Sequence, residues 1–333
     1  MLFALRIILS LRLAMGLYYK CSNSFIISIL LKLYCIICFM YSYLELSTSF
    51  GYDTLSILAL IYSMMFILEI NVNIILSLVT EEKDLIEYFS LSKQTKFCFC
   101  TTFFVISISA VLNIATFVIF FPTSRLVANI WSTYTLTTIC YGRITLVCIA
   151  EHYYKTVKDL CETFKNKLED VNIRDAERSK HVEDYISEYI KLTKYFGITA
   201  KNDKMKMILA YVCEFVNIII AVFFINLLPI LMAARNIIWM MQLAFLVSVA
   251  FVPMILMEFM SNELDGTKRL LVDELLTYKD KKLRAAVYDT LEYIDIASTK
   301  YTIWNGFPMN ASLVVDFFNM CVSYIIATLQ FLY

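Results

Sequence analysis

Charged residues, glycine and proline are all scarce in this chain of 333 residues. Only 17% of the residues are charged, and there are six glycines and four prolines. So little charge excludes an ordinary soluble domain, and no glycine- or proline-rich linker divides the chain. The 29 basic and 29 acidic residues balance, so we expect no nucleic-acid partner.

Groups that could carry catalysis or bind a metal are also few. "CFC" at Cys98 and Cys100 has no second cysteine pair at metal-ligand spacing, and there are only two histidines. The sequence shows no set of nucleophile and base, no metal motif and no phosphate-binding loop. We therefore expect no cofactor, no metal site and no enzymatic activity.

Apolar residues make up 60% of the chain, and the mean hydropathy is +0.68. Runs long enough to cross a hydrocarbon core of about 30 Å recur along it. They are continuous rather than alternating, which predicts helices and not the strands of a barrel. We predict an all-α membrane protein with seven spans, at 24 to 44, 54 to 79, 97 to 121, 129 to 151, 207 to 232, 237 to 259 and 311 to 333.

Lysine and arginine are distributed unevenly between the loops. Four polar segments hold 25 of the 29 basic residues, whereas the three short alternate loops hold only Arg125 and Arg235. Because basic residues accumulate on the cytosolic side, we predict a cytosolic N-terminus and an extracellular C-terminus. None of the ten cysteines lies in those short outer loops, so no extracellular disulfide framework is expected.

These observations predict six regions. Arg6 and Arg12 interrupt the first apolar stretch, which favours an amphipathic cytosolic or interfacial helix over a signal peptide. The regions are a cytosolic N-terminal segment at 1–23, transmembrane helices one to four at 24–151, a cytosolic helical loop at 152–206, helices five and six at 207–259, a second cytosolic helical loop at 260–310, and helix seven at 311–333.

The two cytosolic loops show helical periodicity. After span four, apolar residues recur in a heptad pattern, at Tyr154, Val157, Cys161, Phe164, Leu168 and Val171. This pattern predicts that span four continues into the cytosol as one helix. Further helical faces are predicted at Val182, Ile186, Ile190 and Lys194, at Leu270, Leu271 and Leu275, and at Val287, Leu291 and Ile294. The alternative is that both loops are charged and solvated.

Among the ionisable residues inside predicted spans, four in the inner half are candidates for a charge network. They are Glu69, Arg143, Glu214 and Asp316. Such residues usually face protein or water. One interpretation is a network between Arg143 and Glu69 or Glu214, and the other is separate snorkelling of each side chain to the inner surface.

The outer half of the spans carries aromatic and neutral polar residues. Together they could hold a small neutral ligand, with aromatic faces for its apolar surface and amides to orient it. The alternative is an interfacial aromatic belt. The candidates are Tyr62, Trp131, Tyr134, Thr135, Asn226, Trp239 and Gln242.

The last predicted helix carries one narrow stripe of small and polar residues. The stripe consists of Asp316, Asn319, Ser323, Ala327 and Gln330. Spacings of three and four place these residues on one side of a helix. Such a stripe can pack against other helices or can line water.

The same helix resembles the C-terminal signature of the insect gustatory receptors, which is Thr-Tyr, five hydrophobic residues and Gln-Phe. Here Ser323 and Tyr324 are followed by five apolar or small residues and then by Gln330 and Phe331. The stretch "YTIWNGFPMNASLVVDFF" is similar to the segment that precedes that helix in the family. The resemblance implies a tetramer of seven-helix subunits, homomeric or formed with other gustatory receptor subunits, whose last helices surround a central cation pore.

Gln330 and Phe331 match the positions that form the pore constriction in that family, so the resemblance implies the same role for them. Ser323 and Tyr324 lie on the same helix. It also implies a ligand pocket in the outer half of each subunit. The function expected is therefore a ligand-gated, non-selective cation channel opened by a tastant, in the lipid of the plasma membrane of sensory neurons. A G-protein-coupled receptor would need an outside N-terminus, and a transporter would show inverted repeats. Both remain alternatives.

Overall fold

The structure is a computed structural model of the whole chain. It describes the residues 2–21, 24–43, 54–80, 100–120, 126–168, 175–227, 233–277, 281–296, 302–303, 307–308 and 311–332. Three segments of the described helices are long and apolar enough to cross a bilayer, at Leu60–Thr80, Met205–Val222 and Met240–Asp273. Shorter apolar helices lie at Phe25–Tyr41, Cys100–Ala115 and Ala311–Ala327.

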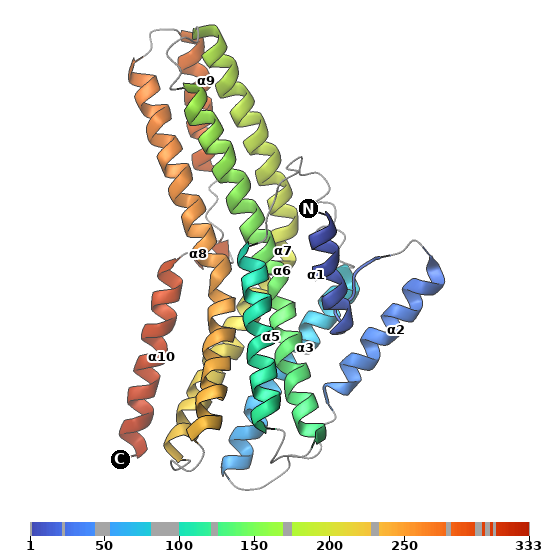
Figure 1. Cartoon of the computed structure of the whole chain (residues 1–333). Coiled ribbons are helices and arrows are strands. Elements are labelled where there is room, and N and C mark those ends of the chain that lie inside the picture. Colours follow the sequence, from blue (N-terminus) through green and yellow to red (C-terminus); the bar gives the residue numbers. More distant parts are fainter. Residues whose placement is uncertain are drawn as a thin grey trace. The chain divides into compact units, whose positions relative to one another are not determined.

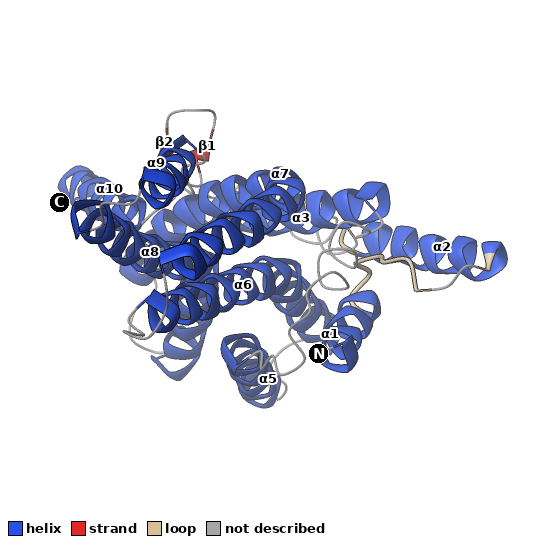
Figure 2. Ribbon diagram, turned by 90° about the horizontal axis from the view of Figure 1, so that it is seen from above, coloured by secondary structure: helices blue, strands red, loops and turns tan. Residues whose placement is uncertain are grey.

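Helices make up nearly all of the described chain (Figure 1). The only described strands are β1 (Thr302–Ile303) and β2 (Phe307–Pro308), which pair antiparallel and are labelled in Figure 2. The expectation of an all-α architecture is confirmed. The helices are α1 (Leu2–Ala14), α2 (Phe25–Tyr41), α3 (Thr54–Thr80), α5 (Cys100–Phe120), α6 (Leu126–Leu168), α7 (Asp175–Leu227), α8 (Ala233–Thr277), α9 (Lys281–Ile296) and α10 (Ala311–Leu332).

Three helices extend well beyond the predicted spans. Without interruption, α6 runs through span four and the heptad segment, and α7 joins the return helix to span five. Span six was predicted to end at 259, and α8 continues as one helix through the predicted helical face at Leu270 and Leu271 to Thr277.

The chain divides into two compact units. The first unit contains Met1–Cys148, Asn202–Val252 and Val315–Tyr333, and the second contains Ile149–Lys201 and Pro253–Val314. Each of α6, α7, α8 and α10 therefore contributes residues to both units. The second unit consists largely of the segments that the sequence assigned to the two cytosolic loops.

In the first unit, α1 ends in a glycine cap. Gly16 has a φ of +83°, which favours glycine. Its N–H donates to the Leu13 carbonyl at 2.9 Å, and the N–H of Leu17 donates to the Arg12 carbonyl at 3.0 Å. This is the Schellman arrangement of hydrogen bonds. A Cβ on Gly16 would lie 2.6 Å from the Cβ of Cys38, so the absence of a side chain lets α1 end directly against α2.

The N-terminal segment is packed rather than laid on a surface. Ile8, Leu9 and Arg12 of α1 are all buried. The Nε of Arg12 donates to the carbonyl of Tyr141 on α6 at 3.1 Å, and the backbone N–H of Tyr18 donates to Ser77 of α3 at 2.9 Å. A buried carbonyl on α6 thus accepts a hydrogen bond from Arg12, which secures α1 to the unit.

The outer side of α2 is apolar and open. Phe25, Ile26, Ile37 and Met40 are all at least 63% exposed, and α2 lies at the margin of the first unit in both views (Figures 1 and 2). Contiguous apolar surface of this kind suits hydrocarbon rather than water.

The core of the second unit contains the heptad seam of α6. Val157, Cys161, Phe164 and Leu168 are at most 5% exposed, which confirms the predicted packing face, while Val171 lies outside the described residues. Phe164 stacks on Tyr185 of α7, with ring centroids 4.4 Å apart. The alternative prediction, a charged and solvated loop, is therefore wrong for this segment.

The buried face of the return helix differs from the prediction. Val182, Tyr185 and Tyr189 are buried, whereas Ile190 is 38% exposed and Lys194 is exposed. The aliphatic residues indicated the wrong face because the packed face is formed largely by tyrosines. Tyr185 contacts the ring of Phe164, and Tyr189 contacts the ring of Tyr293 on α9. In α8 and α9, Leu271, Val287 and Ile294 are buried as predicted.

Candidate functional site

A buried ion-pair cluster joins α3, α6 and α7 in the first unit. Arg143 donates from Nε to Glu69 Oε1 at 2.7 Å and from Nη2 to Glu69 Oε2 at 2.6 Å. The same Nη2 lies 2.7 Å from Oε1 of Glu214. All three side chains are at most 3% exposed. This two-bond geometry is the one that guanidinium and carboxylate groups adopt most favourably.

A fourth helix supplies a neutral acceptor to this cluster. Nη1 of Arg143 donates to the backbone carbonyl of Leu246 on α8 at 2.7 Å. Of the four candidates for a charge network, the structure therefore brings together Glu69, Arg143 and Glu214. Asp316 is exposed on α10 and is not among them.

Two buried amides lie one helical turn from the two carboxylates. Asn73 follows Glu69 by four residues on α3, and Asn217 follows Glu214 by three residues on α7; their exposures are 4% and 0%. Asn73 packs tightly on α6, because a Cβ added to Gly142 would lie 2.7 Å from its Nδ2. The ion cluster is thus extended by uncharged polar groups on the same helix faces.

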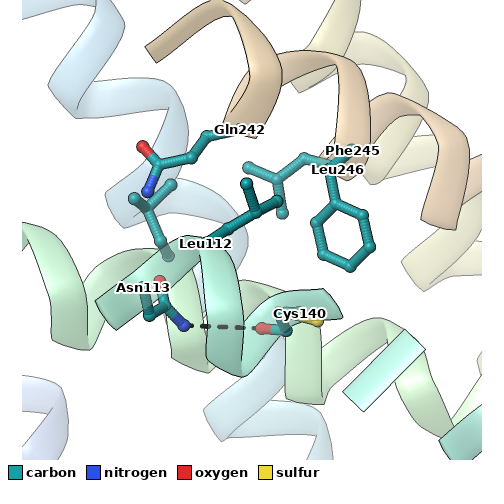
Figure 3. Close-up of a pocket in the computed structure, with 8 residues that line it drawn as sticks. Leu112, Asn113, Cys140, Gln242, Phe245 and Leu246 are labelled. Carbon is teal, nitrogen blue, oxygen red and sulfur yellow. Dashed lines mark hydrogen bonds between the residues drawn. The ribbon is translucent and has the colours of Figure 1, made fainter. Parts of the chain in front are cut away.

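A pocket opens between α5, α6 and α8 of the same unit. Gln242 and Phe245 extend from α8 toward Leu112 and Asn113 of α5 (Figure 3). The space enclosed by the lining side chains is about 10 Å³, the room of about one water molecule. The amide of Asn113 donates to Thr137 at 2.9 Å. The full lining is Ser109, Leu112, Asn113, Leu136, Cys140, Gln242, Phe245 and Leu246, so an apolar wall carries a few orienting polar groups.

Of the ligand-binding candidates whose side chains the structure describes, only Gln242 lines the pocket. Tyr134 instead lies near the carbonyls of Met15 and Cys38, each 3.5 Å from its hydroxyl, and its ring meets Tyr41. Tyr62 packs edge-on against Phe66 of its own helix. Thr135 is buried but does not line the pocket. The side chains of Trp131, Asn226 and Trp239 lie outside the described residues.

Sequence reasoning missed Ser109, Asn113 and Cys140, because short polar residues in an apolar span are common and carry little signal. A usable signal was present on α5. Ser109 and Asn113 are four residues apart, so they share one face of that helix.

The polar stripe of α10 lies opposite the side of that helix that packs. Phe317 and Cys321 are buried, and Phe317 meets Phe251 of α8 and Tyr211 of α7. The stripe residues Asp316, Asn319, Ser323 and Gln330 are exposed. Ser323 donates to the Asn319 carbonyl at 2.9 Å. Within one subunit the stripe is therefore left uncovered.

Tyr324 lies at the edge of the packed face. Its ring meets Phe215 of α7 edge-on, with centroids 5.4 Å apart, while 53% of Tyr324 stays exposed. The side chain of Phe331 lies outside the described residues. Tyr324 thus connects α10 to α7 one helical turn beyond the packed Cys321.

Two buried side chains of the second unit, His152 and Tyr185, have shifted pKa values. His152 is 1% exposed, and burial, with the nearby Lys155 ammonium, lowers its pKa to about 4. Lys155 itself pairs with Glu151 at 2.9 Å. Burial also raises the pKa of Tyr185, whose hydroxyl lies 3.8 Å from the Cys161 sulfur. Among the described residues, no group of three or more metal-ligating side chains occurs.

Comparison with known proteins finds a shared fold but no similar sequence. No family and no curated protein matches the sequence. The insect olfactory receptor OR5 from Machilis hrabei matches with a TM-score of 0.72, and its complex with eugenol matches with 0.69. At 11% identity, each match covers 98% of this chain and 97% of that receptor.

The whole chain therefore has the fold of an insect olfactory receptor. This confirms the insect chemoreceptor fold that the resemblance implied, and both matched structures are receptors rather than enzymes. Because unrelated activities can share a fold, ligand and activity must be argued from this chain's own residues.

Proposed function

We propose that this chain is a subunit of a ligand-gated, non-selective cation channel that a small tastant opens, of the kind found in the gustatory receptors. One observation carries the proposal. Over nearly its full length the chain shares the fold of a ligand-binding olfactory receptor, and its signature Ser323, Tyr324 and Gln330 lies on a helix whose polar side is uncovered.

The proposed subunit spans the plasma membrane of a sensory neuron seven times, with its N-terminus in the cytosol. Four subunits, identical or mixed with other gustatory receptor chains, surround a central pore lined by α10. The uncovered stripe supports this arrangement, because an isolated polar stripe in lipid would leave its side chains without partners. The second unit would form the cytosolic anchor.

The tastant would bind at the pocket between α5, α6 and α8. The space there is about 10 Å³, the room of about one water molecule, so the lining side chains would have to move to admit the tastant. Gln242 and Asn113 would orient it, and Phe245 would cover its apolar surface. A ligand opens the channel only by binding the open state more tightly than the closed state.

Whole-cell recording from cells that express the chain tests this function. A panel of sugars and bitter compounds should include one that evokes an inward current carried by both sodium and potassium. The current should persist in excised patches, where soluble G-protein pathways are lost. A response that needs those pathways would reject the channel and favour a G-protein-coupled receptor.

Epitope tags at the two ends test the orientation independently. On intact cells, antibody should reach the C-terminal tag and not the N-terminal one, which permeabilisation should reveal. An N-terminal tag stained on intact cells would reject the proposed topology.

A further inference from the structure

The ion cluster contains one guanidinium for two carboxylates. Glu69 accepts two hydrogen bonds from Arg143, at 2.7 and 2.6 Å. Glu214 lies 2.7 Å from Nη2 of the same residue, but this contact lacks the geometry of a hydrogen bond. With both carboxyls ionised, the cluster would carry one uncompensated negative charge.

The described groups around the cluster include no second cation to balance that charge. The titratable side chains facing the cluster are Cys140 from α6 and Tyr211 and Cys213 from α7, none of which is basic. From α8 the contact is the Leu246 carbonyl, an acceptor. Within the described part of the chain, Arg143 is the only basic residue paired with either carboxylate. A buried charge without a partner is costly, and such a group usually takes up a proton instead.

The hydrogen bonds indicate which carboxyl takes the proton. Donors directed at a carboxylate favour its ionised form, and Arg143 directs two at Glu69. Glu214 interacts with Arg143 less strongly than Glu69 does, since only one guanidinium nitrogen lies near it. The neutral form is therefore favoured at Glu214.

Asn217 provides an independent observation that points to the same residue. Its side chain is fully buried, and both its amide nitrogen and its amide oxygen lack a partner among the described residues. It lies three residues after Glu214, on the same face of α7. A neutral carboxylic acid complements an amide, because its O–H can donate to the amide oxygen while its carbonyl accepts from the amide N–H.

We propose that Glu214 holds a proton in the folded protein, beside the buried amide of Asn217, so that the cluster is a buried site for a single proton. Glu69 and Arg143 then form the ionised pair, and the cluster is neutral. This inference concerns the folded chain and does not depend on channel activity.

Infrared difference spectroscopy of the purified full-length protein at neutral pH tests the site. The wild type should show the carbonyl stretching band of a protonated carboxyl, shifted in D₂O. Glu214→Gln should remove it. Glu69→Gln leaves one carboxylate for one guanidinium, and it should also remove the band. Asp316→Asn, on the exposed side of α10, should leave it unchanged.

The two amides provide a matched pair of variants that locates the proton. Asn217→Leu should keep the band but move it to higher frequency, because the acid loses its neighbouring amide. Asn73→Leu, one turn from Glu69, should leave its frequency unchanged. Elution as a single species in size-exclusion chromatography checks that each variant is folded.

Three results would overturn the site. In the first, Glu214→Gln removes no acid band from the wild-type spectrum. In the second, the band persists in Glu69→Gln. In the third, Asn73→Leu shifts the band and Asn217→Leu does not, which would place the proton on Glu69.

Discussion

Arg143 of α6 and Glu69 of α3 form two parallel hydrogen bonds inside the first unit. Arg143→Met would leave the buried carboxylate of Glu69 without a cation, so we expect a loss of about 3–5 kcal/mol in the free energy of unfolding. Glu69→Gln should cost less, because Glu214 remains 2.7 Å from the guanidinium. Thermal unfolding of the detergent-solubilised protein measures both.

Asp316→Asn is the control for this pair, since Asp316 is exposed and should change stability little. Equal losses in Arg143→Met and Asp316→Asn would show that the cluster contributes nothing specific to the packing of these helices.

Tyr185 should be a principal residue of the second unit's core. It is 3% exposed and stacks on Phe164, and large-to-small changes at buried aromatic sites cost about 3–5 kcal/mol. Tyr185→Ala should therefore increase hydrogen exchange in 175–201. Ile190→Ala, on the exposed side of the same helix, should not. If Ile190→Ala had the larger effect, the aliphatic face read from the sequence would be the packed one.

Continuous helices and their seams were predictable from this sequence because period and length are local properties. The heptad from Val157 to Leu168 showed that α6 continues beyond the apolar run. The packed face at Tyr185 was missed because tyrosine occurs both on surfaces and in cores. Its burial here depends on the ring of Phe164, which is distant in the sequence.

The candidate site was predictable only in part, for a related reason. Ionisable residues in apolar spans stand out, so Glu69, Arg143 and Glu214 were found, although the sequence could not decide between a network and separate side chains. Asp316 is also an ionisable residue in an apolar span, but it is exposed on α10 and does not join the buried cluster. Tyr134 could not be placed, because its position depends on α1 and α2 packing beside it.

His152 should make stability depend on pH in the acid range. Its pKa is lowered to about 4 from about 6.5 in an unfolded chain. The unfolded state therefore binds the proton first, so this contribution is fully present above about pH 6.5 and is lost as the pH falls toward 4. His152→Gln should reduce the loss of thermal stability across this window.

His181→Gln is the matched control, because the chain contains only these two histidines and His181 is only partly buried. A steeper loss of stability with acid in His152→Gln than in the wild type would contradict the role of the buried imidazole.

Gln242 should set the potency of the ligand if the pocket between α5 and α8 is the binding site. Loss of one hydrogen bond costs about 0.5–1.5 kcal/mol, so Gln242→Leu should raise the half-maximal concentration about two- to tenfold. Asn113→Leu should act similarly. Ser248→Ala, an exposed position on α8, should leave potency unchanged at equal surface expression. Unchanged potency in both pocket variants would place the ligand elsewhere.

Gln330 and Phe331 should control the ion path. Fourfold symmetry would bring a ring of amides and a ring of aromatic side chains together near the end of α10. An apolar ring closes a pore by dewetting, and amide oxygens can replace part of a cation's hydration shell. Gln330→Ala should therefore change the reversal potential in mixed cations, and Phe331→Ala should raise the current without ligand. A helix used only for packing would show reduced tetramer formation in both.

Water access to the stripe distinguishes a pore from a packing surface. Ser323 is exposed and lies opposite Phe317 and Cys321, so Ser323→Cys should react with a charged, water-soluble thiol reagent, and faster when ligand opens the channel. Gln330→Cys should behave alike. Ile325→Cys, on another side of α10, should react slowly in both conditions, because lipid or protein would cover it. If all three cysteines react equally slowly with and without ligand, water does not reach the stripe, and the exposed polar side of α10 is instead the surface on which another helix packs.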